Sequence, residues 1–459
     1  GYYFYDAQKA PAVPITTGSS SWNGRIVGSD FGDSDRYLTQ GTTNDAPVGD
    51  GFKVTFADNS DHLDIPQVTQ AGWQVVGTSL GTFAYRVNNT AVTELNLLGN
   101  FGNAFNRKAG DLYGIILLPE SATGADIEAA RKLLIDRGAA DGAASTSISN
   151  YFRGRNDIVE FGNVNLDSVT HASQLFGGSG NIQKFNVPSL PNAVVLNSAW
   201  EQGALRSFTT QLPKAQNVSY AWYSNTELES FSVDLPEVTS ALSAWYNCST
   251  LSDFKTTDIK NCTTFASAWR GCSSLSSFPA GAKLGTSAQN VNFTNSWQQS
   301  GLTSFSTPLP TAGDTRFAWK ECTSLTSFSS ELPSATNVSQ SWYGCSSLSS
   351  FTTTDIKNCT NFTGAWQNCS SLSSFPSDAL LGTEATNVNF QDAWRSSGIT
   401  SFSTPLPTAT NLRSSFEDAV SLVSFNSQLP LATNALFAWD NCSSLTSFDV
   451  SLPSLTAMY

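Results

Sequence analysis

The chain has 459 residues, with 24 Lys or Arg against 37 Asp or Glu, and its formal net charge is −13. This balance argues against binding to nucleic acid or to anionic lipid, because both require clustered Lys and Arg side chains. Charged residues make up 13% of the chain and aromatic residues 12%, a composition that can bury a large core. The sequence contains no run of about 18 apolar residues, so no transmembrane helix is predicted.

Residues 1–120 are predicted to form a small β-rich module for attachment or assembly. Apolar and polar residues alternate in Phe52–Phe56 and in Trp73–Val76, between turns rich in Gly and Asp, and this alternation predicts strands. The aromatic segment Gly1–Tyr5 is expected to pack on its own module or to pair with a neighbouring subunit by strand addition, and the first is favoured.

Residues 121–145 are predicted to form a capping helix and a linker. The helix is expected over Ala125–Arg137, because Gly138 follows it directly and apolar residues recur at helical spacing. The predicted apolar face carries Ile127, Ala130, Leu133 and Leu134. A helix at this place predicts an N-terminal cap, since an open solenoid end would expose its core and strand edges.

Residues 146–459 contain a repeat. Phe recurs thirteen times, from Phe161 to Phe448, at spacings of 23 to 27 residues. Leu or Ile stands three residues before each of these Phe anchors, and a large aromatic residue stands eight or nine before it, which accounts for ten of the twelve tryptophans. Such a period is typical of a solenoid whose rungs stack and share one elongated core.

Each rung is predicted to contain one short strand and one short helical return. Leu325–Phe328 illustrates the strand, which Pro333 prevents from continuing. Ala335–Cys345 carries apolar residues at helix-like spacing and predicts a helical turn or a short 3₁₀ segment. The predicted fold class is therefore α/β to mainly β, a leucine-rich-repeat type solenoid of about thirteen rungs after a β-rich module and one capping helix.

The sequence also contains a longer repeat, which spans several rungs. Phe254–Ser350 aligns without gaps to Phe351–Ser447, an offset of 97 residues that equals four rungs. The two copies differ mostly near the Trp positions, for example at Arg270 against Gln367. Two interpretations remain open: drift at solvent-exposed sites, and diversification of a recognition face.

Six of the eight cysteines stand six residues before an anchor Phe and form a column. Cys262 and Cys359 occupy positions where neighbouring rungs carry Ala or Val. Residues that exchange with Ala and Val behave as small buried hydrophobes, so buried thiols are expected, with cross-rung disulfides as the alternative. No Cys-x-x-Cys pair supports a zinc site.

No catalytic residue, metal site or cofactor is predicted. The two histidines, His62 and His171, have no nearby nucleophile motif. The oxygen-rich runs Asp30–Asp35 and Asp58–Asp64 do not match an EF-hand loop and have the composition of ordinary turns. Paired carboxylates could still hydrolyse a glycan without histidine, but nothing in the sequence marks such a pair.

The segments Trp342–Phe351 and Asn441–Phe448 carry an aromatic, Cys-Ser-Ser-Leu core that resembles BspA-type leucine-rich repeat surface proteins. The resemblance covers residues 146–459, and it departs from the family pattern in using Trp for the usual Phe and a Phe anchor for the usual aliphatic residue. It implies an extracellular adhesin. Leu118–Glu120 and the helix after it look like the version found in tail-fibre or host-attachment proteins of bacteriophages.

The predicted function is non-enzymatic recognition or adhesion on a virion or cell surface, with a host-surface glycan or surface protein as partner and neither nucleic acid nor membrane insertion involved. The alternatives are a structural filament or sheath subunit that its neighbours complete, using the N-terminal module, and a surface-acting glycan depolymerase. Candidate binding residues lie on the strand face or on the opposite return. The strand face offers Thr303, Thr326 and Thr400, and the return offers Arg270, Gln298, Gln299, Gln367 and Arg395.

Overall fold

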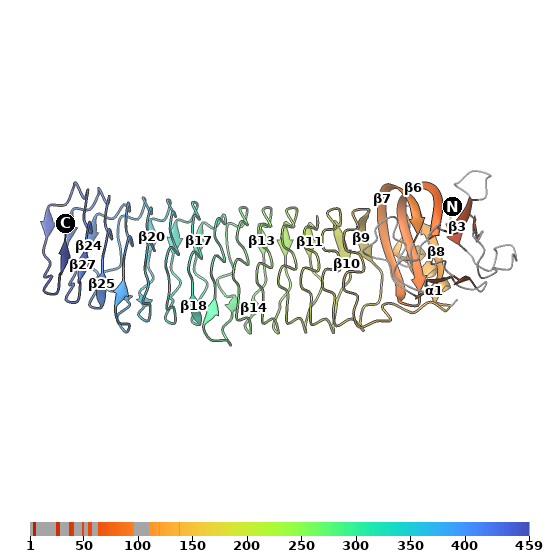
Figure 1. Cartoon of the computed structure of the whole chain (residues 1–459), viewed down its shortest axis with the longest axis horizontal. Coiled ribbons are helices and arrows are strands. Elements are labelled where there is room, and N and C mark those ends of the chain that lie inside the picture. The colour runs from red at the N-terminus through yellow and green to blue at the C-terminus, as the bar shows by residue number, and fades with distance from the viewer. Residues whose placement is uncertain are drawn as a thin grey trace. The chain divides into compact units, whose positions relative to one another are not determined.

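The computed structural model describes residues 63–95, 110–118, 120–136 and 138–458, together with five short strands between residues 3 and 56. The chain divides into two compact units, residues 1–213 and 214–459. Both units contain rungs of a β-solenoid of about thirteen turns, which confirms the predicted fold class (Figure 1). The division into a β module, a capping helix with linker, and a solenoid stays a prediction.

Unit 1 is built around a ten-stranded sheet in the order β10-β9-β7-β6-β3-β2-β1-β8-β5-β4, in which β6 also pairs with β8. The predicted strands near residues 52–56 and 73–76 are confirmed as parts of β5 and β6. β1 pairs antiparallel with β2 and β8, so the aromatic start of the chain lies within its own sheet, as predicted. The strands are β1 (Tyr3–Tyr5), β2 (Gly24–Val27), β3 (Arg36–Gln40), β4 (Val48–Gly49), β5 (Val54–Phe56), β6 (Leu63–Thr78), β7 (Gly81–Leu95), β8 (Gly110–Leu118), β9 (Ile158–Gly162), β10 (Lys184–Asn186) and, outside the sheet, β11 (Ser207–Phe208).

The predicted helix is present as α1, Gly124–Ile135, and it packs on the sheet. Thr123 caps it through a reciprocal capping box with Asp126, which satisfies free N–H groups of the first turn. The predicted apolar face was wrong at Leu133, which is 44% exposed. Because the sheet-facing stripe follows the i, i+3, i+4, i+7 pattern, Arg131 is buried instead. The stripe is Ile127, Ala130, Arg131 and Leu134.

The first solenoid strand of unit 1 continues the sheet of the N-terminal module. β7 pairs antiparallel with β9, with Tyr85 opposite Phe161, and β9 pairs in parallel with β10. An open strand edge at this point would offer unpaired N–H and C=O groups to another chain. Backbone pairing with β7 therefore covers the edge of the first rung, while α1 covers the face of the sheet.

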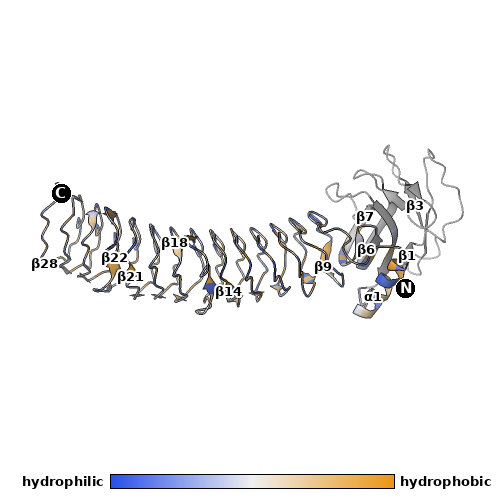
Figure 2. Cartoon of the chain, turned by 90° about the horizontal axis from the view of Figure 1, so that it is seen from below, coloured by the Kyte–Doolittle hydropathy of each residue, from blue (hydrophilic) through white to orange (hydrophobic). Residues whose placement is uncertain are grey.

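In unit 2 the Ser-Phe pieces around the anchors form short parallel strands in register, with Ser327 beside Ser350 and Phe328 beside Phe351. The rungs follow one another in the same orientation (Figures 1 and 2). The anchor strands are β12 (Ser230–Phe231), β13 (Asp253–Phe254), β17 (Ser304–Phe305), β19 (Ser327–Phe328), β20 (Ser350–Phe351), β24 (Ser401–Phe402), β26 (Ser424–Phe425) and β28 (Ser447–Phe448).

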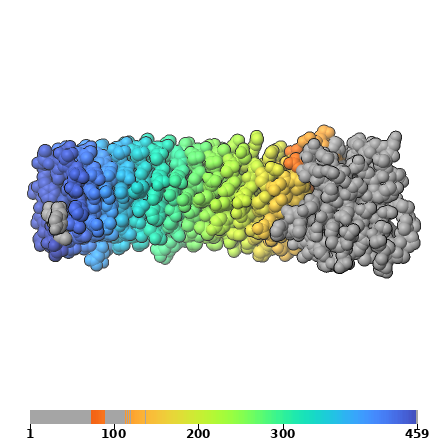
Figure 3. Space-filling model, turned by 45° about the horizontal axis from the view of Figure 1, so that its top comes forward, coloured from red at the N-terminus to blue at the C-terminus, as the bar shows by residue number. Residues whose placement is uncertain are grey.

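A second row of parallel strands runs along another side of unit 2. It includes β16 (Val291–Asn292), β18 (Ala312–Asp314), β23 (Val388–Asn389), β25 (Ala409–Asn411), β27 (Asn434–Ala435) and β29 (Ala457–Met458). The two 27-residue rungs add the pairs β14 (Asp258–Ile259) with β15 (Lys283–Leu284), and β21 (Asp355–Ile356) with β22 (Leu380–Leu381). Both longer rungs protrude from the side of unit 2 in Figure 3.

The predicted helical return was wrong, because tandem turns occupy its place. In one rung Val338, Gln340 and Trp342 donate their N–H groups to the next rung, whereas Ser341, Tyr343 and Cys345 donate to carbonyls three residues earlier. This alternation requires left-handed residues on both sides of the Trp, at Gln340 (φ 52°) and Gly344 (φ 71°). The apolar spacing of four and three residues is shared by a helix and by these turns, so it misled the prediction.

Two columns of aromatic rings fill the core of unit 2. Trp342 and Trp366 stack at 5.2 Å between centroids and 3° between planes, and Phe328 and Phe351 stack at 5.6 Å and 9°. Trp342 meets Phe351 edge to face at 5.0 Å and 83°, a favoured geometry for aromatic pairs. The same three contacts recur from rung to rung, so the repeat encodes one continuous aromatic core.

All eight cysteines are unpaired and seven are buried, which confirms the buried thiols and shows that the cross-rung disulfide alternative was wrong. Each thiol of the column donates to the carbonyl of a preceding aromatic residue, as Cys345 Sγ does to Trp319 O at 3.1 Å. Burial raises the pKa of the Cys272 thiol to about 12. These thiols are therefore packing groups with little thiolate near neutral pH.

Candidate functional site

The strand-face candidates Thr303, Thr326 and Thr400 are exposed and stand directly before anchor strands. Each hydroxyl donates to a carbonyl of the preceding rung: Thr303 to Ser276 O at 3.0 Å, Thr326 to Thr303 O at 2.9 Å, and Thr400 to Ser373 O at 3.0 Å. Their donor capacity is therefore engaged in rung spacing, and only acceptor lone pairs are left for a ligand.

The return candidates belong to one column of side chains. We define the return column of unit 2 as the residues that directly follow the large aromatic residue of each rung. The N–H of the next residue in each rung donates to the column carbonyl of the following rung, as Asn247 N does to Arg270 O at 2.7 Å and Gln299 N to Lys320 O at 2.9 Å. The return column comprises Tyr223, Tyr246, Arg270, Gln298, Lys320, Tyr343, Gln367, Arg395, Glu417 and Asp440.

Four of the five return candidates lie in this column, and Gln299 is its immediate neighbour. Arg270, Gln367 and Arg395 are half-buried, while Gln298 is only 9% exposed and offers little surface. Gln299 is exposed, and its Nε2 donates to Glu321 Oε2 at 2.8 Å. The structure thus brings these residues into one column along unit 2, apart from the anchor-strand row that carries the three threonines.

Sequence reasoning missed the aromatic and lysine members of the column. Tyr223 and Tyr246 stack at 4.8 Å between centroids with an interplanar angle of 8°, and the Arg270 guanidinium lies 5.6 Å from the Tyr246 ring. Lys320 Nζ lies 4.7 Å from the Tyr343 ring and 5.4 Å from the Phe317 ring. Their common place, one residue after the large aromatic residue of each rung, was readable from the repeat.

The cations of the column differ in their partners. Among the residues that the structure describes, no carboxylate oxygen lies within 4.0 Å of Arg270 or Lys320. Lys320 Nζ instead donates to Gln340 Oε1 at 3.2 Å. Arg395 is neutralised, with Glu417 at 3.0 Å, Asp392 at 3.7 Å and Asp418 at 3.9 Å. Positive charge is therefore available only in the first part of the column.

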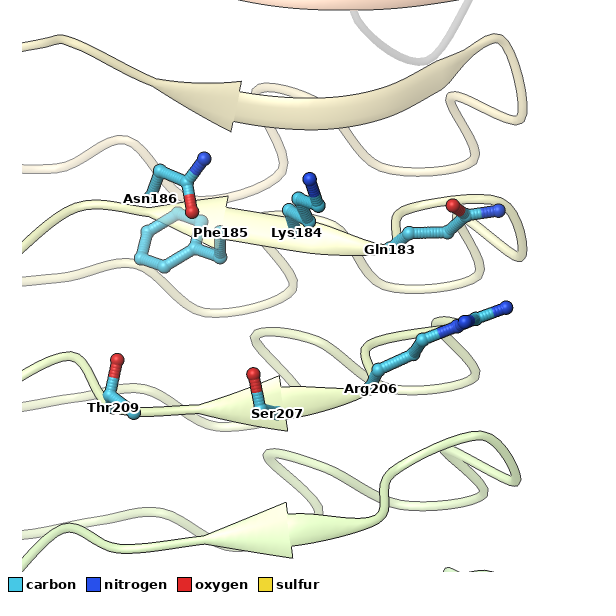
Figure 4. Close-up of a pocket in the computed structure, with 7 residues that line it drawn as sticks. All are labelled: Gln183, Lys184, Phe185, Asn186, Arg206, Ser207 and Thr209. Carbon is cyan, nitrogen blue, oxygen red and sulfur yellow. The ribbon is translucent and has the colours of Figure 1, made fainter.

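Unit 1 has a shallow pocket of about 420 Å³ on the strand face, between β10 and β11 (Figure 4). Its lining contains no carboxylate, histidine or cysteine, so it supplies no acid–base pair. Enclosed small-molecule sites are mostly apolar, whereas this lining is polar apart from Phe185. The lining residues are Gln183, Lys184, Phe185, Asn186, Arg206, Ser207 and Thr209.

The described residues offer no group of three or more His, Cys, Asp or Glu that could hold a metal ion. His171 is exposed, and its Nδ1 lies 2.9 Å from Thr170 Oγ1. His62, the run Asp30–Asp35 and most of the run Asp58–Asp64 lie outside the described residues. The return column offers hydrogen-bonding groups, stacked aromatic rings and positive charge without a carboxylate partner among the described residues. These features suit binding.

Neither a family model nor a curated protein matches the chain. Two solved structures are similar to it. One is a leucine-rich repeat protein from Bacteroides ovatus ATCC 8483, with 16% identity and a TM-score of 0.33 over 52% of this chain and 65% of that one, less than two thirds of its length. The other is a leucine-rich cell surface protein from Faecalibacterium prausnitzii A2-165, with 15% identity and a TM-score of 0.21 over 54% of this chain and 79% of that one. Similarity at this level transfers no function, because one fold serves many functions.

A search of the described helices finds none with the length and apolar character needed to cross a membrane.

Proposed function

We propose that the chain is a non-enzymatic recognition protein of an extracellular surface, which binds an extended polar partner through the return column. The partner is a glycan, or else a surface protein that presents a comparable polar surface. More specifically, we propose a recognition protein of the bacteriophage tail-fibre type. Only the sequence resemblance supports this more specific proposal.

The observation that carries the proposal is the composition of the return column between Tyr223 and Tyr343. Tyrosine and arginine are the residue types enriched at binding hot spots, because they combine contact area with directed hydrogen bonds. Tyr223, Tyr246, Arg270 and Lys320 are all half-buried, so their side chains are held in place while one side stays accessible. Ordering such side chains on binding costs little entropy.

The repeat favours an extended partner over a small molecule. Column members recur once per rung, and the backbone hydrogen bonds between rungs hold them in register. A polymer that lies along the column can therefore form many modest contacts at once. The alternative function, a filament subunit joined by its N-terminal arm, has no comparable support, since β1 is paired on both sides within its own sheet.

The test compares two variants of the full chain on an array of immobilised polysaccharides and surface proteins. The first variant replaces Tyr223, Tyr246 and Tyr343 with Ser, and the control replaces Thr303, Thr326 and Thr400 with Val. We expect the first variant to lose binding and the control to keep it. Loss in the control alone would move the site to the strand face, and unchanged binding by the first variant would overturn the proposal.

A further inference from the structure

The four-rung duplication allows the column to be compared with itself. The first copy, residues 254–350, contributes Arg270, Gln298, Lys320 and Tyr343. The second copy, residues 351–447, contributes Gln367, Arg395, Glu417 and Asp440 at the equivalent positions. All four positions differ, although the large aromatic residue before each of them is Trp in every case but one, Phe416.

The substitutions change the charge of the column. The first copy carries two cations and no carboxylate in the column, and the second carries one cation and two carboxylates. The arginine of the second copy, Arg395, is further neutralised by Glu417, Asp392 and Asp418. In the first copy Arg270 and Lys320 lie against aromatic rings and have no carboxylate within 4.0 Å among the described side chains.

The two column cations of the first copy are not neutralised by the acidic residue that lies nearest to them in sequence. The nearest acidic neighbour in sequence, Glu321, accepts a hydrogen bond from Gln299. Arg270 Nε is shielded from solvent and makes no hydrogen bond. This side chain is half-buried as a whole, so its accessible part lies elsewhere on the side chain, and a guanidinium hydrogen-bonds an anionic oxygen more strongly than a neutral acceptor. In a chain of net charge −13, such positive charge is a local feature.

We infer that the first-copy column, Arg270 to Tyr343, selects anionic glycans: polysaccharides that bear sulfate or carboxylate groups. This inference rests on the proposed function and specifies its ligand class. Two rungs separate Arg270 from Lys320, roughly 10 Å at the usual strand spacing. One extended polysaccharide with acidic groups at regular intervals can therefore meet both cations, while Tyr246 and Tyr343 flank them with ring surface for sugars.

The experiment measures binding of the full chain to dextran sulfate and to uncharged dextran of the same length. We expect dextran sulfate to bind and dextran to bind at least tenfold more weakly, with the difference shrinking as salt is added. The double variant Arg270→Gln, Lys320→Glu installs the residues of the second copy and should weaken dextran sulfate binding by about a hundredfold, since each charged contact is worth about tenfold. The matched control Arg316→Gln removes an exposed arginine outside the column, which pairs with Asp314, and should leave binding unchanged.

A gain-of-function variant tests the same inference by adding cations to the second copy. Gln367→Arg, Arg395→Gln, Glu417→Lys and Asp440→Tyr copy the first-copy side chains onto the second copy. We expect this variant to bind more dextran sulfate per chain than the natural protein. An unchanged stoichiometry would count against the column as the site.

The outcomes separate this inference from the proposed function. Equal binding of the two dextrans, with no effect of the double variant, would overturn anion selectivity and leave the proposed function standing. Binding of neither dextran, together with no binding on the array, would overturn both. Single-stranded DNA is the third probe, and if it binds as tightly as dextran sulfate, the assignment to glycans is wrong.

Discussion

Arg155 is a charged side chain that the fold of unit 1 buries almost completely, at 1% exposure. Its guanidinium forms two hydrogen bonds of 2.7 Å with Asp157 and lies 5.1 Å from the Tyr85 ring of β7. The backbone carbonyl of Asp157 also accepts from Asn88 N at 2.9 Å. This cluster ties the N-terminal sheet to the first rungs, and no repeat pattern marks it.

Asp157→Ala should destabilise this junction strongly. Removing one partner of a buried ion pair leaves an uncompensated charge, which costs about 3–5 kcal/mol. The loss should appear as faster hydrogen exchange of β7 and β9 amides. The control is Lys255→Ala, which breaks an exposed ion pair with Asp253 and should cost less than about 1 kcal/mol. Equal effects of the two variants would contradict the role of Arg155.

The buried thiols predict a loss of stability in alkali. Burial raises the pKa of Cys322 to about 11 from an ordinary value of 9.0. The folded chain therefore keeps protons that the unfolded chain releases, so the contribution of Cys322 is intact below pH 9 and is lost as the pH rises from 9 to about 11.

The measurement is chemical denaturation of the full chain at pH 8 and at pH 10.5. The variant Cys322→Ala removes one such thiol and should lose less stability between these two pH values than the natural chain. Ala is a natural choice at this position, because Ala419 occupies the equivalent place in the second copy. Identical pH dependence of the two proteins would contradict the assignment.

At the scale of the element, close approach between the backbones of neighbouring rungs restricts the residue between Trp297 and Phe305. Nine residues usually separate the two, but only eight separate Trp297 from Phe305, and Gly301 lies between them. A Cβ at Gly301 would overlap the backbone oxygen of Ser273 in the preceding rung. At Gly301 the two backbones approach too closely for a Cβ, and glycine permits that approach.

Gly301→Ala should therefore destabilise its rung by about 1–3 kcal/mol, the usual cost of overpacking. Gly281→Ala is the matched control, because a Cβ at Gly281 would meet no heavy atom within 4 Å. Thermal unfolding of the two variants decides the matter: a lower midpoint is expected for the first and an unchanged midpoint for the second. A midpoint that stays the same in both would show that the rungs can separate at little cost.

The return also shows why some elements resist sequence prediction. Val338, Trp342 and Cys345 are all buried, so their spacing correctly marked the inward face. The conformation between them depended on the neighbouring rung, which accepts every second N–H group. The residue pattern within one rung carries no information about hydrogen bonds to the next rung. A helix, whose hydrogen bonds are local, was therefore predicted.

At the scale of the molecule, the four-rung duplication is a unit of construction. Repeat proteins gain stability from each repeat and from its contacts with neighbours, so removing whole rungs preserves the remaining interfaces. Deletion of residues 254–350 would join Asp253 to Phe351 and keep every remaining rung in register. We expect a folded solenoid, measured by circular dichroism and size-exclusion chromatography, that has lost dextran sulfate binding.

The control deletion removes residues 254–340, which leaves a partial rung. It should aggregate or unfold at lower temperature, because the partial rung breaks the register of the Trp and Phe columns. If both deletions were equally stable, the register of whole rungs would have no structural meaning. If the first deletion still bound dextran sulfate, the binding site would lie outside the first copy.

The sequence by itself determined the solenoid, its number of rungs and the composition of its core. Each Trp, anchor Phe and column Cys recurs at one position per rung, and a side chain that faces inward must be apolar wherever it recurs. The same logic located Arg270, Gln367 and Arg395 as outward-facing differences between the copies. These inferences needed only the period, because the period is the signal that stacking imposes on the sequence.

The tertiary structure alone decided which outward-facing side chains are available to a partner. Arg395 is neutralised by Glu417 in the next rung, whereas Arg270 lies against the ring of Tyr246 in the preceding rung. It also decided that Gln298 is mostly buried and that β7 covers the first rung. Stacking of the rungs decides which side chains become neighbours. A cation that gains a carboxylate neighbour in this way is neutralised, whereas a cation without one stays available to bind a partner.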